Sequence, residues 1–105
     1  MKVTIMLVCA AGMSTSLMVE KMKKAAENKG IEADIFAVSA GEADNYLESK
    51  KVDVLLLGPQ VRFMKSKFEE KVEQYKFALD IIPMVDYGMM NGEKVLDQAI
   101  NLLNQ

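Results

Sequence analysis

Short apolar segments alternate with helical patterns along the chain, and this alternation limits the fold more than any other feature of the sequence. The apolar segments are candidate strands and span residues 3–8, 31–38, 52–57 and 78–83. The candidate helices have apolar residues at every third or fourth position, and they span residues 16–29, 41–49 and 61–75, with a last one carrying Leu96, Ala99, Ile100 and Leu103. Near-continuous apolar strands between helices are typical of a parallel sheet that is covered on both faces.

We therefore predict an α/β fold with one open sheet between two layers of helices, a three-layer sandwich like the flavodoxin and Rossmann folds. The chain has 105 residues, which is enough for one hydrophobic core without disulfides. No linker or low-complexity segment interrupts the alternation. We expect residues 1–105 to form one domain.

The first candidate helix has one apolar side, which we expect to face the core. Its apolar residues are Leu17, Met18, Met22, Ala25 and Ala26. Gly30 should end this helix, because glycine is favoured just past a helix end.

Composition excludes several classes of function. The chain has one cysteine and no histidine, so it has no internal disulfide, no Cys–His catalytic pair and no usual zinc ligands. Its net charge is -2, which gives no overall attraction to nucleic acid. Met1 and Lys2 lead directly into the first apolar segment, which is too short for a signal peptide or a membrane span. We expect a cytoplasmic protein without a metal or cofactor.

Cys9 stands where the first candidate strand runs into a stretch of small residues and then a helix. In parallel α/β folds, functional groups lie beyond the carboxyl ends of the strands. Backbone N–H groups of a loop and a helix start bind phosphate there, and the same environment favours a nucleophilic thiolate. Gly12 and its small neighbours would let the backbone approach a phosphoryl group. Alternatively, Cys9 is a buried small hydrophobic residue. In either case we expect one of Ser14, Thr15 and Ser16 to cap the helix.

Other candidate residues follow the later strands or flank the cysteine. Gln60 and Tyr87 are auxiliary candidates for orienting a phosphoryl group or a partner. Asp86 would repel a phosphate, and Arg62 is at most a contact at the rim of the site. An apolar collar for partner docking would include Met13, Leu17 and Met89, because methionine suits surfaces that adapt to different partners.

A cysteine phosphatase of similar layout carries an arginine six residues after its cysteine. Here that position is Thr15, and the only arginine of the chain is Arg62. Without an arginine in the loop, a phosphoryl group would be held but poorly hydrolysed. The absence therefore favours a carrier over a hydrolase.

Three motifs together resemble one known family. They are IMLVCAAGMSTS at residues 5–16, LGPQ at 57–60 and YGMMNG at 87–92. On these motifs the chain resembles the IIB component of the bacterial phosphoenolpyruvate-dependent sugar phosphotransferase system (PTS), in the lactose/cellobiose/chitobiose class (type 3). In this family a loop without arginine is normal.

The resemblance implies a relay in two steps. A phosphohistidine of the IIA partner phosphorylates Cys9, and the phosphocysteine passes its phosphoryl group to a sugar such as cellobiose or chitobiose, held by the membrane permease IIC. It also implies four parallel strands in the order 2-1-3-4. The phosphoryl group would be cradled by the backbone amides of Ala10, Ala11, Gly12, Met13, Ser14, Thr15 and Ser16. Two alternatives stay open, a cysteine phosphatase-like hydrolase and a non-catalytic module that senses phosphorylation or redox state through Cys9.

Overall fold

A computed structural model describes residues 2–10 and 13–104 of the chain. In this part of the chain, four strands form one parallel sheet with the order β2-β1-β3-β4, which confirms the predicted topology. The strands are β1 (Val3–Cys9), β2 (Ala33–Ser39), β3 (Val54–Leu57) and β4 (Ala78–Ile81). The helices are α1 (Met13–Lys29), α2 (Ala43–Ser49), α3 (Lys65–Tyr75), α4 (Met84–Gly88) and α5 (Gly92–Leu103), with two 3₁₀ segments, η1 (Ala40–Glu42) and η2 (Pro59–Met64).

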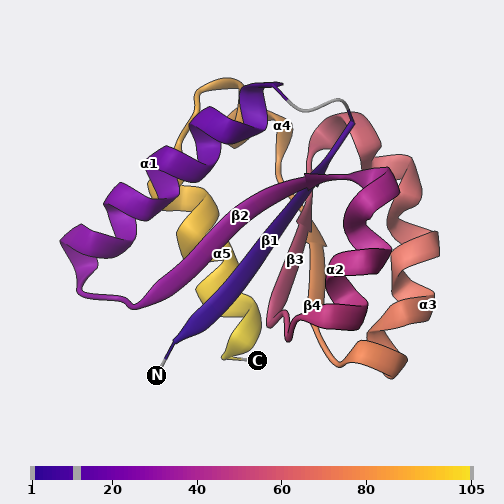
Figure 1. Cartoon of the computed structure of the whole chain (residues 1–105). Coiled ribbons are helices and arrows are strands. Elements are labelled where there is room, and N and C mark those ends of the chain that lie inside the picture. Colours follow the sequence, from indigo (N-terminus) through magenta and orange to yellow (C-terminus); the bar gives the residue numbers. More distant parts are fainter. Residues whose placement is uncertain (1, 11–12, 105) are drawn as a thin grey trace.

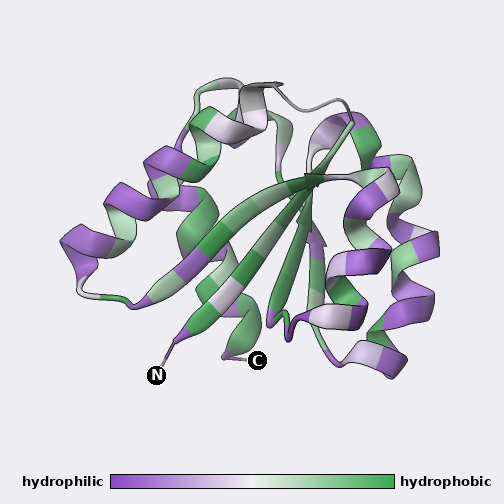
Figure 2. Cartoon of the chain, in the orientation of Figure 1, coloured by the Kyte–Doolittle hydropathy of each residue, from purple (hydrophilic) through white to green (hydrophobic). Residues whose placement is uncertain are grey.

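Helices cover both faces of the sheet (Figure 1), with α1 and α5 on one side and α2 and α3 on the other. Successive residues of β1 point to opposite faces, so Ile5 and Leu7 belong to the core under α1 and α5, and Met6 and Val8 to the other core. Because both faces of the two central strands are buried, β1 and β3 are apolar almost throughout (Figure 2). The carboxyl ends of the strands lie at the top of Figure 1.

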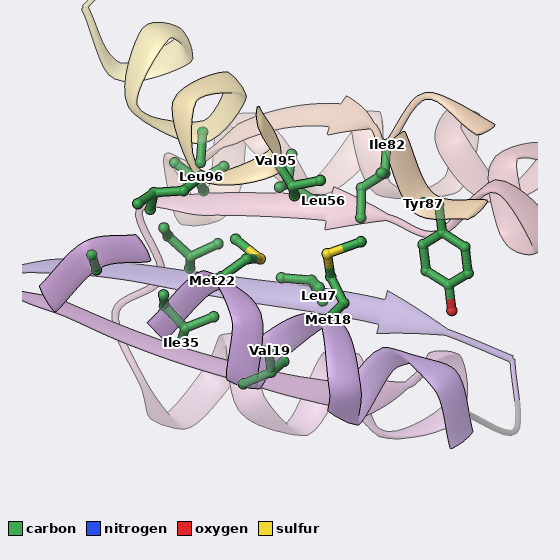
Figure 3. Close-up of a cluster of buried hydrophobic side chains, with 14 residues drawn as sticks. Leu7, Met18, Val19, Met22, Ile35, Leu56, Ile82, Tyr87, Val95 and Leu96 are labelled. Atoms are coloured by element: carbon green, nitrogen blue, oxygen red, sulfur yellow. The ribbon is translucent and has the colours of Figure 1, made fainter. Parts of the chain in front are cut away.

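The two cores differ in the side chains that fill them. Figure 3 shows the core under α1 and α5, where Met18 and Met22 of α1 and Leu96 of α5 belong to one apolar cluster with side chains of the sheet. On the opposite face Phe68 of α3 is fully buried. Burying a side chain of this size contributes roughly 1.5–3 kcal/mol to folding.

Helix α1 begins earlier and faces the core differently from the prediction. It begins at Met13, so Ser14, Thr15 and Ser16 lie inside the helix, and the expected hydroxyl cap among them is wrong. Leu17 is 50% exposed, so its place on the core face was also wrong. The buried side of α1 is Met18, Val19, Met22 and Ala26, a stripe whose spacing follows the helical period once Leu17 is left out.

The end of α1 agrees with the prediction. Gly30 has a φ of 69°, in the left-handed region that glycine enters without strain. The amide of Ile31 donates to the carbonyl of Ala26 at 2.9 Å, which closes the last turn of the helix as in a Schellman motif.

Two later segments also differ from expectation. The helix expected over 61–75 is divided, because Pro59 starts a 3₁₀ turn and Val61 leaves helical geometry at φ -118° and ψ 23°, so that α3 begins at Lys65. The turn-rich stretch 86–92 is partly helical, because α4 covers Met84–Gly88. In the described residues we find no helix with the length and apolar character that crossing a bilayer requires.

Candidate functional site

Cys9 is the last residue of β1, at the carboxyl edge of the sheet. The chain leaves β1 toward β2 on one side, while β3 lies on the other side, so Cys9 stands at the point where the strand order reverses. Its side chain is 5% exposed, and its thiol donates a hydrogen bond to the carbonyl of Val38 on β2 at 3.5 Å. Cys9, which the sequence predicts as a nucleophile, therefore lies at the expected edge of the sheet, held close to the neighbouring strand.

The predicted phosphate loop is described only in part. Ala10 is exposed directly after Cys9, whereas Ala11, Gly12 and the side chains of Met13 and Ser14 lie outside the described residues. Helix α1 begins at Met13. The first N–H groups of a helix have no partner within it and carry its partial positive charge, so this end suits an anion held beside Cys9.

The two remaining loop candidates, Thr15 and Ser16, have opposite surroundings. Ser16 is exposed. Thr15 is 1% exposed, and its hydroxyl lies 3.2 Å from the hydroxyl of Tyr87. The structure thus brings Thr15 and Tyr87 together, a contact that sequence reasoning did not find, and it directs the Thr15 side chain into the protein.

Gln60 reaches the same edge from the loop after β3. The amide of Gly58 donates to the carbonyl of Val8 at 2.9 Å, which joins this loop to the residue before Cys9. A methyl group on Gly58 would lie 3.0 Å from Gln60 Oε1 and 3.5 Å from the Val8 oxygen. The side chain of Gln60 therefore folds back over Gly58, in the loop that is bonded to β1.

Arg62 and Asp86 have other surroundings. The guanidinium of Arg62 donates to the carbonyl of Pro59 at 3.3 Å, within its own turn. Asp86 lines a hollow of about 360 Å³ together with Lys94 and Asp97 of α5. Neither contact involves the cysteine.

Exposed apolar side chains gather on elements at the carboxyl edge of the sheet. Two predicted docking residues are among them, Leu17 at 50% exposure and Met89 at 75%; the third, Met13, lies outside the described side chains. Sequence reasoning missed three others, Phe63, Met84 and Val85. The signal was available, because Phe63 follows Gly58-Pro59 and the other two follow Pro83, in the segments after strand ends where a site was expected.

Within the described part of the chain, no group of acidic residues and Cys9 is arranged to hold a metal ion. The groups at this edge include one thiol, the N–H groups at the start of α1 and the side chains of nearby loops.

This arrangement defines a class of small α/β protein, one with a single cysteine at the carboxyl edge of a parallel sheet, shortly before a helix begins. Comparison with known proteins gives the family within that class. The model of the family described as "PTS system, Lactose/Cellobiose specific IIB subunit" matches residues 4–98. The chain belongs to this family, as its motifs indicated, and it is a phosphoryl carrier, a phosphotransferase component of a sugar PTS.

Individual relatives match over nearly the full length. The cellobiose-specific EIIB component of Lactococcus lactis subsp. lactis (strain IL1403) is 55% identical over 103 residues, which cover 95% of each chain. The galactose-specific EIIB component of Lactococcus lactis subsp. cremoris (strain MG1363) has the same identity and coverage. The solution structure of a cellobiose-specific IIB component from Borrelia burgdorferi is 43% identical, with a TM-score of 0.78 over 99% of this chain and 94% of that one.

Proposed function

We propose that Cys9 is the residue that carries the phosphoryl group, and that it receives this group from a phosphohistidine of a IIA protein. The observation that carries the proposal is the position of Cys9, the one cysteine of the chain, at the carboxyl end of β1, with the start of α1 following shortly after it at Met13. In the first step the sulfur attacks phosphorus as the phosphorus–nitrogen bond breaks. The thiol proton ends on the imidazole of the donor, so the thiol gives up its hydrogen bond to Val38.

In the second step a hydroxyl of the sugar attacks the phosphocysteine. The phosphorus–sulfur bond breaks, the sulfur leaves as a thiolate, and the hydroxyl proton passes to a base of the permease IIC. Both steps are in-line transfers that depend on positioning and charge stabilisation. This chain supplies them through the backbone amides of residues 10–16 and the positive end of α1, without a cofactor.

One face of the protein has to serve both partners, because one sulfur reacts with both. We assign docking to Met13, Leu17 and Met89, and the exposure of the last two supports this. Gln60 is an auxiliary residue over the end of β1, and residues 1–105 act as one IIB domain. The protein works in the cytoplasm and meets the membrane through IIC, with no role for nucleic acid.

The sugar is proposed as a β-linked disaccharide such as cellobiose. Two relatives with the same 55% identity are named for different sugars, cellobiose and galactose. Overall similarity of the IIB chain therefore does not set the sugar, and we assign most of this selectivity to the permease.

Intact-mass spectrometry tests the carrier role. The protein and its Cys9→Ser variant are incubated with phosphoenolpyruvate, the general transfer proteins and a cognate IIA. The wild type should gain one adduct of about 80 Da, the mass of a phosphoryl group, and lose it when sugar and permease membranes are added. The matched control Ser39→Ala changes the residue paired with Cys9 on β2 and should gain the same adduct.

The alternatives give different outcomes. No adduct in the wild type, with a donor shown to be active, would contradict the proposal. Rapid hydrolysis of a simple phosphomonoester would indicate a phosphatase. An adduct that persists with sugar and permease present would indicate a sensing module.

A further inference from the structure

The buried pair Thr15 and Tyr87 joins two elements that are far apart in the sequence. If tyrosine is left aside, Thr15 is the one buried polar side chain among the described residues. It is 1% exposed. Its hydroxyl lies 3.2 Å from that of Tyr87, 72 residues away. Figure 3 shows Tyr87 at the end of the apolar cluster, with its hydroxyl directed toward the first turns of α1.

A hydroxyl in an apolar core is destabilising unless it has a hydrogen-bond partner. Each of these two hydroxyls provides a partner for the other. The contact therefore specifies how the start of α1 meets α4, in addition to the apolar packing around it.

Thr15 lies in the first turn of α1, which begins at Met13. The amides of this turn are those without partners inside the helix, and they are the groups assigned above to the phosphoryl group. A bond that fixes the Thr15 side chain also fixes the rotation of this turn, and so the direction of its N–H groups.

The rest of α1 is fixed by other contacts. Met18 and Met22 are fully buried in the core, and Gly92 of α5 lies against the backbone at Lys21 and Met22. These contacts lie one to two turns further along, so they constrain the first turn less directly than Thr15 does.

Tyr87 belongs to an anchored segment. Its amide donates to the carbonyl of Pro83 at 3.0 Å, and the amide of Asn91 donates to the carbonyl of Asp86 at 2.9 Å. The side chain of Asn91 in turn accepts a hydrogen bond from the amide of Lys94 and caps the start of α5. The Tyr87 hydroxyl is thus attached to a short helix held at both ends.

From these contacts we propose that Tyr87 is a positioning residue for phosphoryl transfer, acting through Thr15 to orient the first turn of α1. This proposal rests on the proposed function, because it names what aligns the amides beside Cys9. It assigns Tyr87 a role that requires no contact with the phosphoryl group.

The test compares Tyr87→Phe, Thr15→Val, the double variant and Thr15→Ser, at a temperature where circular dichroism shows all of them folded. With a phosphorylated IIA as donor, kcat for phosphorylation of Cys9 should fall about threefold to tenfold in each single variant, as expected for one lost neutral hydrogen bond. KM for the donor should stay unchanged. The double variant should be no slower than either single one, and Thr15→Ser should restore the rate.

Tyr46→Phe is the matched control, since Tyr46 lies on α2 and packs against Phe36 at 5.3 Å between ring centroids; its kcat should equal that of the wild type. Unchanged kcat in Tyr87→Phe would overturn the proposal. So would a double variant whose loss is the product of the two single losses, because Tyr87 would then act independently of Thr15.

Amide hydrogen exchange in the unphosphorylated protein tests the pair without any donor. Exchange of the amides of Leu17 and Met18, whose helical hydrogen-bond acceptors lie four residues earlier in the first turn, should be faster in Tyr87→Phe and Thr15→Val than in the wild type, and equal exchange would overturn the proposed anchoring. If exchange responds but the wild type is never phosphorylated, the anchoring stands and the proposed function fails.

Discussion

The contact between α1 and α5 leads to a sharp prediction at Gly92. A methyl group at this position would lie 2.6 Å from the carbonyl carbon and Cβ of Lys21, and 2.7 Å from the amide nitrogen of Met22. Gly92 does not adopt a positive φ, so the need for glycine here is steric. The atoms in the way are mostly backbone, which cannot move aside as a side chain can.

The magnitude follows from the overlap. Carbon atoms pack at about 3.5–4.0 Å, so the two helices would have to separate by roughly 1 Å in Gly92→Ala. Such overpacking costs about 1–3 kcal/mol. The upper part of that range applies, because Val95 and Leu96 of α5 are fully buried against the same core as Met22 and would be displaced with the helix.

We therefore expect Gly92→Ala to lose about 2–3 kcal/mol of unfolding free energy, which for a domain of this size lowers Tm by roughly 10–20 °C. Urea unfolding followed by circular dichroism measures this, with a common m-value in both proteins as a check on two-state behaviour.

Gly41→Ala is the matched control. No heavy atom lies within 4 Å of a methyl group there, and the backbone is not in the left-handed region. Its stability should stay within about 0.5 kcal/mol of the wild type. If Gly92→Ala unfolds at the same urea concentration as Gly41→Ala, the close approach of α5 to α1 is wrong.

Substitutions at three further positions test local features by urea unfolding. Asn91→Ala should destabilise the protein by about 1 kcal/mol, because it removes the side chain that caps α5 by accepting a hydrogen bond from the amide of Lys94. Asn91→Asp should keep the cap. Equal stability of the wild type and both variants would contradict the capping. Lys76→Gly should stabilise the protein by up to about 1 kcal/mol, because Lys76 ends α3 at a φ of 57°, where glycine has no backbone strain. A loss of stability would refute strain at Lys76. A hydrogen bond from Lys50 and its charge lower the pKa of Asp34 from its ordinary value of 3.8. The contribution of this pair to stability is therefore fully present at pH values above 3.8 and is lost as the pH falls through the lowered pKa of the folded protein. The destabilisation by Lys50→Met should therefore be under about 1 kcal/mol for this partly exposed pair and should shrink between pH 6 and pH 3, and a pH-independent difference would count against the pair.

Much of the fold could be predicted because its local signals agree with its tertiary structure. Residues 5–8 and 54–57 are buried on both faces of the sheet, so uninterrupted apolar runs were enough to locate β1 and β3. The position of Cys9 at the end of β1 followed from the same pattern. A strand that ends in a cysteine and small residues before a helix carries its chemistry in contiguous sequence.

Other features depended on distant parts of the chain. The hydroxyl of Thr15 suggested a helix cap when considered locally, and only the packing of α4 against α1 pairs it with Tyr87. Phe63 fits a helical pattern, but Pro59 and Val61 change the local geometry, and its side chain is 78% exposed. The burial and hydrogen bonding of such residues depend on contacts between distant segments, which the spacing of apolar residues does not show.

The sequence by itself determined where the four strands and the longer helices lie, and that Cys9 stands at a strand end. Alternation of elements leaves the strand order open, because every parallel order uses the same apolar strands, and the order 2-1-3-4 was inferred from the family resemblance. Only the tertiary structure decided that Leu17 faces outward, that Gly92 lies against α1 and that Tyr87 meets Thr15. Hydrophobic patterning selects a face of each element, whereas contacts between elements depend on how those faces pack together.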